Sequence, residues 1–222
     1  MARLLIATLN VLYDPRIAPD SAEHFDARWP RMSDALVKTA ADLIALQECH
    51  VDWLPRLAEF AESHEYQLLS VEYHAHRSAH LVTLVRPALL VGWQTTRYEA
   101  SYTATLTAIM EAGGHRLYVT NVHLPLDVAD SGERRAVTSQ VARDQVGRTS
   151  VVVGDWNTLP GLGDEKQRSA FEECGMTLVD WDMVAGNAES PYPRKSWRRL
   201  AVSVPGCNLT VSPRPRRPPG RR

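Results

Sequence analysis

Cysteine is scarce in this chain, and its few cysteines cannot form a framework. Cys49, Cys174 and Cys207 are odd in number and widely spaced. Disulfide-dense secreted domains have paired cysteines, and structural zinc sites have closely spaced ones. The pattern therefore argues against both a disulfide scaffold and a zinc finger, and it favours a protein kept in a reducing compartment.

Long apolar runs are also missing. A membrane-spanning helix needs about 20 consecutive apolar residues, and no stretch of this sequence comes close to that length. The opening segment holds one basic residue and a short apolar run, then turns polar at Asn10 and Asp14. That pattern predicts a strand and not a secretory signal. We expect a cytoplasmic protein with no membrane span.

A glycine-rich loop for binding nucleotide phosphates is absent as well. The sequence contains neither a Walker motif nor a dinucleotide-binding fingerprint. The pair Gly113-Gly114 lies between two apolar runs, where it predicts a hairpin turn. Kinase and dehydrogenase functions therefore lack support.

The composition that remains is that of a globular protein. The chain has 222 residues, of which 44% are hydrophobic and 23% charged, enough for one sizeable core. We expect a single domain over residues 1–212. Residues 213–222 hold five arginines and four prolines without an acidic residue, and they predict a disordered tail. Since the formal net charge is −1, this tail is the main hint of attraction to a polyanion.

Short apolar runs alternate with amphipathic stretches along the chain. Runs bounded by polar or turn residues predict strands, and they cover residues 4–8, 43–47, 81–85, 89–93, 117–122 and 151–154. Helices are predicted after Pro30, which is placed like a first-turn proline, over residues 54–61, and from Asp164 to a stop at Gly175. Residues 71–107 read mostly as strand, so part of the sheet is expected to be antiparallel. Together these elements predict a layered α/β architecture.

Polar side chains stand where four of the predicted strands end. These residues are Asn10, Glu48, His123, Asp155 and Asn157. A single polar residue after a strand usually just starts a loop, but here a carboxamide, carboxylates and an imidazole recur at the same place. Phosphate-ester hydrolysis needs this set: hard oxygen ligands for Mg²⁺, a carboxylate to activate water, and donors for the developing negative charge.

The motifs around these residues resemble the endonuclease/exonuclease/phosphatase superfamily in order and approximate spacing. The four motifs are Ala7-Thr-Leu-Asn10-Val-Leu, Ile44-Ala-Leu-Gln-Glu48, Asn121-Val-His123-Leu and Gly154-Asp155-Trp-Asn157. The resemblance runs from about residue 3 to about residue 200. It implies a DNase I-like, four-layered α/β sandwich, in which two mixed β-sheets pack face to face with helices outside.

The resemblance also implies roles for the residues. Glu48, helped by Asn10, would hold Mg²⁺ or Mn²⁺, and Asp155 would activate the attacking water. Asn157 would support that water or the phosphate oxygens, while His123 would contact the phosphoryl group. Either Tyr73 or Tyr102 could stand where the superfamily often brings a tyrosine to the phosphate. The partner would be a phosphate-ester substrate, such as a nucleic acid, with no obligate protein partner.

The end of the sequence departs from the family pattern. The family closes with an Arg-x-Asp-Tyr-like strand and a Ser-Asp-His motif, whereas this chain has Arg199-Leu-Ala201-Val and Ser212-Pro-Arg214 there. Both acids and the histidine are missing, and losing such a group typically costs about two or more orders of magnitude in rate. The prolines after Ser212 could not donate to a central ladder.

Two explanations compete for this departure. The terminus could be altered or frame-shifted on an otherwise ordinary enzyme. Alternatively, the chain is a divergent, catalytically impaired or inactive member that binds nucleic acid or a protein on the same scaffold.

Overall fold

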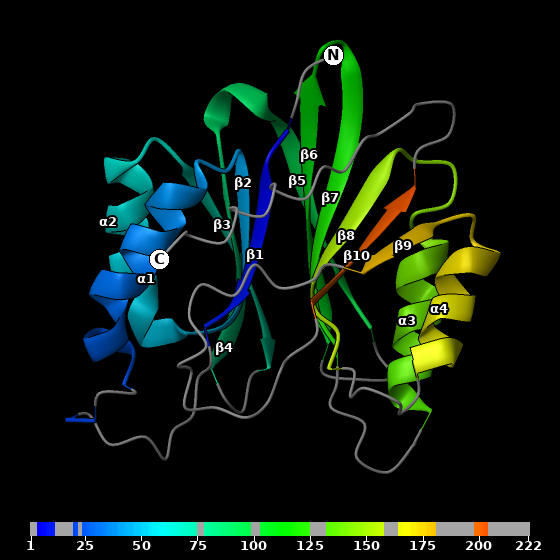
Figure 1. Cartoon of the computed structure of the whole chain (residues 1–222), viewed down its shortest axis with the longest axis horizontal. Coiled ribbons are helices and arrows are strands. Elements are labelled where there is room, and N and C mark those ends of the chain that lie inside the picture. Colours follow the sequence, from blue (N-terminus) through cyan, green and yellow to red (C-terminus); the bar gives the residue numbers. More distant parts are fainter. Residues whose placement is uncertain are drawn as a thin grey trace, which may run out of the picture.

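Two β-sheets pack face to face, with helices on the outer side of each (Figure 1). This computed structural model describes residues 4–11, 20–21, 24–74, 78–98, 103–124, 132–157, 164–180 and 198–203. The predicted tail and the Ser212-Pro-Arg214 segment lie outside these residues. Among the described residues, no helix is long and apolar enough to cross a membrane.

Within the described residues, the first sheet has four strands in the order β1-β2-β4-β3. Its strands are β1 (Ile6–Asn10), β2 (Leu43–His50), β3 (Gln67–His74) and β4 (Ala79–Val85). The pair β1 and β2 is parallel, whereas β4 pairs antiparallel with both β2 and β3. The outer face is covered by α1 (Phe25–Thr39) and α2 (Leu54–Ser63), which follows the short helix η1 (Val51–Trp53).

The second sheet, over the part of the chain that the structure describes, has six strands in the order β5-β6-β7-β8-β10-β9. After η3 (Pro87–Leu89) come β5 (Leu90–Arg97), β6 (Ala104–Ala112), β7 (His115–His123), β8 (Ser150–Asp155), β9 (Thr177–Asp180) and β10 (Arg198–Ser203). Only β7 and β8 pair in parallel among these described strands. Helices α3 (Glu133–Arg143) and α4 (Asp164–Glu173) lie outside this sheet (Figure 1).

Alternating side chains divide the buried residues into layers. Leu43 and Ala45 of β2 face the second sheet and join Leu106 and Val119 in the central core. Ile44 of β2 points the other way, toward the helices of the first sheet. A third cluster, which includes Trp156 and Phe171, fills the space under α3 and α4. This confirms the predicted four-layered α/β sandwich with two mixed sheets.

Local sequence signals predicted most helices and strands where the structure has them, but the start of one helix was predicted at the wrong residue. Both Gly113 and Gly114 have positive φ in the β6–β7 turn, as a two-residue hairpin requires. Helix α1, however, begins at Phe25, and Pro30 lies inside it. The prediction of a first-turn proline was therefore wrong: the helix starts where His24 Nδ1 accepts a hydrogen bond from the backbone N–H of Asp26.

Candidate active site

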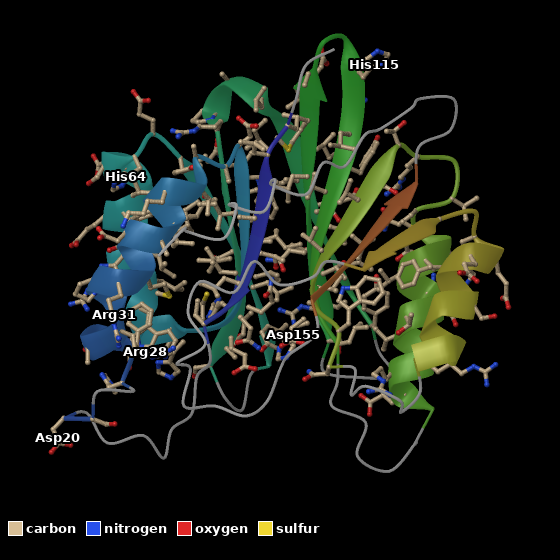
Figure 2. The ribbon with its side chains drawn as sticks, viewed as in Figure 1. Asp20, Arg28, Arg31, His64, His115 and Asp155 are labelled. Atoms are coloured by element: carbon tan, nitrogen blue, oxygen red, sulfur yellow. The ribbon has the colours of Figure 1, made fainter. Side chains whose placement is uncertain are left out.

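The predicted site residues meet at one end of the sandwich, between the two sheets. The parallel pairs β1–β2 and β7–β8 end there, because parallel strands present their carboxyl ends at the same edge. His123 and Asp155 are direct register partners at the ends of β7 and β8. Figure 2 shows Asp155 near this end, whereas His115, at the start of β7, lies at the opposite end.

Asn10 connects the carboxylates that come from different sheets. Its Nδ2 donates to Oε1 of Glu48 over 2.8 Å and to Oδ2 of Asp155 over 2.8 Å. Asp155 is 4% exposed, and its Oδ1 accepts from the backbone N–H of Asn157 over 2.9 Å. These bonds aim both carboxylates at the same small space and satisfy part of their hydrogen-bonding capacity.

His123 is held from both sides of its ring. Its Nδ1 lies 2.5 Å from the hydroxyl of Tyr73, and its Nε2 lies 2.9 Å from Nδ2 of Asn157. Asn157 Nδ2 also donates to the carbonyl of Leu124 over 2.6 Å, which fixes the amide with its NH₂ toward the ring. Because this amide donates, Nε2 of His123 accepts and Nδ1 carries the proton that meets Tyr73.

Three unusual backbone conformations shape the site. Glu48 has φ 58° beside a register shift between Leu46 and Cys49, and Asn157 has φ 48°. Such left-handed conformations are costly for residues other than glycine and asparagine, and they recur at functional sites. The carbonyl of Asn157 is held by Nη1 of Arg134 over 2.7 Å. At Gly154, with φ 142°, a Cβ would lie 1.9 Å from the carbonyl oxygen of Val122.

The arrangement offers donor atoms for a cation. One ligand atom from each of Glu48, His123 and Asp155 lies within 4.8 Å of the others. His123 Nε2 is 3.5 Å from Oε1 of Glu48. Two carboxylates and an imidazole so close together are suited to a divalent metal ion.

Solved structures share this architecture. ANGEL2, described as a 2',3'-cyclic phosphatase and bound to adenosine-2',3'-vanadate, matches with TM-score 0.61 at 16% identity, over 82% of this chain and 59% of that one. TDP2 from D. rerio, complexed with a single-strand DNA product, matches with TM-score 0.65 at 16% identity, over 93% and 86% of the two chains. An endonuclease/exonuclease/phosphatase family protein from Bacteroides thetaiotaomicron matches with TM-score 0.65 at 15% identity, over 90% and 83%.

The chain has the endonuclease/exonuclease/phosphatase, or DNase I-like, fold. Likeness at this level of identity concerns the fold alone, and the chain spans 59% of the ANGEL2 chain. Comparison with protein-family models finds no match, and comparison with curated protein sequences finds none either. The resemblance inferred from the motifs is confirmed for the architecture.

On this DNase I-like scaffold, the structure brings all five predicted residues together. Of the two candidate tyrosines, Tyr73 reaches the site through His123, and Tyr102 lies outside the described residues. Sequence reasoning missed Arg134, which supports Asn157 from α3. It also assigned no role to Gln47 and Asn121. Side-chain alternation along a strand places both residues on the buried face, and a polar residue in such a position was a signal of a special role.

Proposed function

We propose that this chain is a divalent-metal-dependent hydrolase of phosphodiester or phosphomonoester bonds. The observation that carries the proposal is the bridge from Asn10 to Glu48 and Asp155, which gathers two carboxylates from different sheets beside His123. The DNase I-like fold supports it, since a 2',3'-cyclic phosphatase and a TDP2 bound to a DNA product share that fold.

The residues fit a hard divalent cation, which we propose to be Mg²⁺ or Mn²⁺. Glu48 and Asn10 would hold it, because carboxylate and carboxamide oxygens are the ligands that such cations prefer. Asp155 would add its negative charge from the second sheet, since its carboxylate lies in the same group of candidate ligand atoms as that of Glu48. When bound, the metal would supply positive charge against the phosphate oxygens. Within the protein, Asn10 has a further task, which is to keep Glu48 and Asp155 aimed at the same point.

Asp155 is the residue we propose to activate water. Its carboxylate is held at both oxygens by N–H donors from Asn10 and Asn157, so it cannot rotate freely. A carboxylate fixed in this way can accept a proton from a water positioned for in-line attack on phosphorus. Asn157 would support that water or the phosphate oxygens.

His123 would contact the phosphoryl group. Its Nε2 lies 2.9 Å from Nδ2 of Asn157, so this amide orients the ring within the site. Tyr73, on the other ring nitrogen, would keep the imidazole in place.

Conservative variants test the proposal. Glu48→Gln and Asp155→Asn keep the shapes of the side chains but remove the charges. We expect each to lower kcat/KM for bis(p-nitrophenyl) phosphate with Mn²⁺ by about 100-fold or more. Glu111→Gln is the matched control, because Glu111 is an exposed acid on β6. Unchanged hydrolysis in both site variants would rule the mechanism out.

The rival function is a binding module on the same scaffold, favoured by the five arginines of residues 213–222. It predicts salt-dependent binding of a polyanion that is lost when these residues are deleted. Single-stranded DNA and heparin serve as probes, with binding measured across salt concentrations. If polyanion binding survives the deletion, the arginines do not carry it. If substrate turnover depends on Glu48, the results favour the enzymatic function over the binding module.

A further inference from the structure

Two buried amide side chains join the sheets directly behind the site. Gln47 lies on β2 and Asn121 on β7, and they are 0% and 1% exposed. Nε2 of Gln47 donates to Oδ1 of Asn121 over 2.7 Å. Gln47 and Asn121 are called the inter-sheet amide pair below.

The pair is tied to several strands. Nδ2 of Asn121, a residue of the second sheet, donates to the carbonyls of Leu46 over 3.1 Å and Val82 over 3.0 Å in the first sheet. Nε2 of Gln47 also donates to Oγ1 of Thr8 over 3.1 Å. One connected network therefore links β7 to β1, β2 and β4, and every amide hydrogen of Asn121 has an acceptor in the opposite sheet.

The position of the network matters because the site is divided between the sheets. Gln47 immediately precedes Glu48 and pairs in register with Asn10. Asn121 comes two residues before His123 and pairs in register with Val153, two residues before Asp155. The central core between the sheets also holds a large apolar cluster, which includes Leu43 and Val119, and apolar packing is non-directional. Directional hydrogen bonds between the sheets can set a distance that apolar contacts leave adjustable.

We infer that the inter-sheet amide pair is a positioning device that fixes Glu48 and Asn10 relative to His123 and Asp155. The inference rests on the proposed function and deepens it. Neither amide touches the reacting atoms; both act through their neighbours. Supporting groups of this kind commonly decide the affinity of a metal site.

The alternative is that the pair only stabilises the fold, as any satisfied buried hydrogen bond does. Thr107 and Thr120 provide the comparison, because their hydroxyls lie 3.0 Å apart and both residues are buried. They belong to β6 and β7, so their bond stays within one sheet. Breaking it costs a buried hydrogen bond without loosening one sheet from the other.

The test compares Gln47→Met and Gln47→Asn with Thr107→Val. Gln47→Met keeps the size of the side chain but removes the bond, and Gln47→Asn keeps the amide but draws it back by one methylene. Titration calorimetry measures Mn²⁺ affinity, and hydrolysis of bis(p-nitrophenyl) phosphate gives kcat and KM. Urea unfolding measures stability. We expect both Gln47 variants to weaken Mn²⁺ binding by about tenfold or more and to lower kcat with little change in KM. Thr107→Val should lose stability and keep both properties.

Two results would overturn the inference. One is a folded Gln47 variant that binds Mn²⁺ and turns over substrate like the parent. The other is an equal loss of both properties in Thr107→Val, which would show that any buried bond has this effect. If Gln47→Met fails to fold, the Mn²⁺ affinity and kcat of Gln47→Asn test the inference instead.

The proposed function can fail separately, in which case the parent itself neither binds Mn²⁺ nor hydrolyses the substrate. A double-mutant cycle of Gln47→Met with Asn121→Leu then tests the bridge through unfolding free energies alone. Coupling between the two substitutions would support the bridge between the sheets, and additive effects would overturn it.

Discussion

Side-chain alternation along the strands explains why most of the site residues point inward. Thr8 and Asn10 follow Ile6 on the face of β1 that packs on the central core, and Asp155 follows Val153 in the same way on β8. Glu48 is the exception, because regular alternation would turn it with Leu46 toward the helices. Its φ of 58° and the adjacent register shift break the alternation and bring the carboxylate to Asn10.

Replacing Tyr73 with phenylalanine tests how His123 is held. The ring contact, with centroids 5.2 Å apart, would remain, but the hydrogen bond to Nδ1 would be lost. A hydrogen bond contributes about 1 kcal/mol net, which corresponds to a rate loss of about fivefold. We expect kcat for phosphodiester hydrolysis to fall by that factor.

Tyr66→Phe is the matched control for this substitution. The Tyr66 hydroxyl donates to the carbonyl of Ala41 over 2.6 Å, beneath the helices of the first sheet. This change should lower stability and leave kcat unchanged. Equal rates for Tyr73→Phe and the parent would show that the hydroxyl does not serve the reaction.

Gly154 is expected to tolerate no side chain. Its Cβ would fall 1.9 Å from the carbonyl oxygen of Val122, a backbone atom of the neighbouring strand. The overlap can be relieved only by separating β7 from β8, so Gly154→Ala should cost about 3 kcal/mol or more. Gly114→Ala, with φ 78° and nothing within 4 Å of the added Cβ, should cost only about 1–2 kcal/mol. Urea unfolding measures both, and similar losses would contradict the steric explanation.

At the level of elements, the sequence predicted what depends on local pattern. Apolar runs in the sequence predicted strands β2, β7 and β8 and the polar residues at their ends. A buried strand must be apolar, whereas its exposed end can be polar. The inward turn of Glu48 could not be predicted, since it depends on a β-bulge against β4. Pro30 misplaced the start of α1, because a proline can be accommodated inside a helix as well as at its first turn. Helix α3 was missed, and with it Arg134.

Strand β4 carries a histidine that should make stability depend on pH. His80 pairs with Cys49 of β2 and Glu72 of β3, beside register shifts in both ladders. Its Nδ1 is buried without a hydrogen-bond partner among the described residues. Burial lowers the pKa of His80 from its ordinary value of 6.5, against the opposing effect of Glu72, while His50 lowers it further.

The sign of the pH effect follows from this lowered pKa. Below pH 6.5 the unfolded chain takes up a proton at His80 more readily than the folded chain does. The folded state therefore loses stability as pH falls through 6.5 toward the folded-state pKa. We expect His80→Gln to lose less stability than the parent between about pH 7.5 and about pH 5.5, as measured by urea midpoints. Parallel profiles for the two proteins would disprove the contribution of His80.

On the scale of the whole molecule, the site depends on two sheets meeting correctly. Asn10 and Glu48 come from the first sheet, and His123 and Asp155 come from the second. Each sheet also has its own helices and its own apolar cluster outside the central core. The geometry of the site therefore depends on how the two sheets are held together.

A metal bound between the sheets should stabilise the folded chain as a whole. A ligand present at about 100 times its dissociation constant adds about 2.7 kcal/mol, because it binds only the folded state. For a chain of this size that corresponds to a rise in Tm of roughly 5–10 °C. We expect Mn²⁺ to raise the Tm of the parent by this amount in differential scanning calorimetry, and EDTA to reverse the rise.

The stabilisation should require both halves of the site. Glu48→Gln removes a ligand from the first sheet and Asp155→Asn removes a charge from the second, so each alone should abolish most of the rise in Tm. The exposed Glu111→Gln should keep it. If Glu48→Gln lost the rise and Asp155→Asn kept it, the cation would be held by the first sheet alone. The sheets would then meet to bring Asp155 and His123 to the substrate, without sharing the metal.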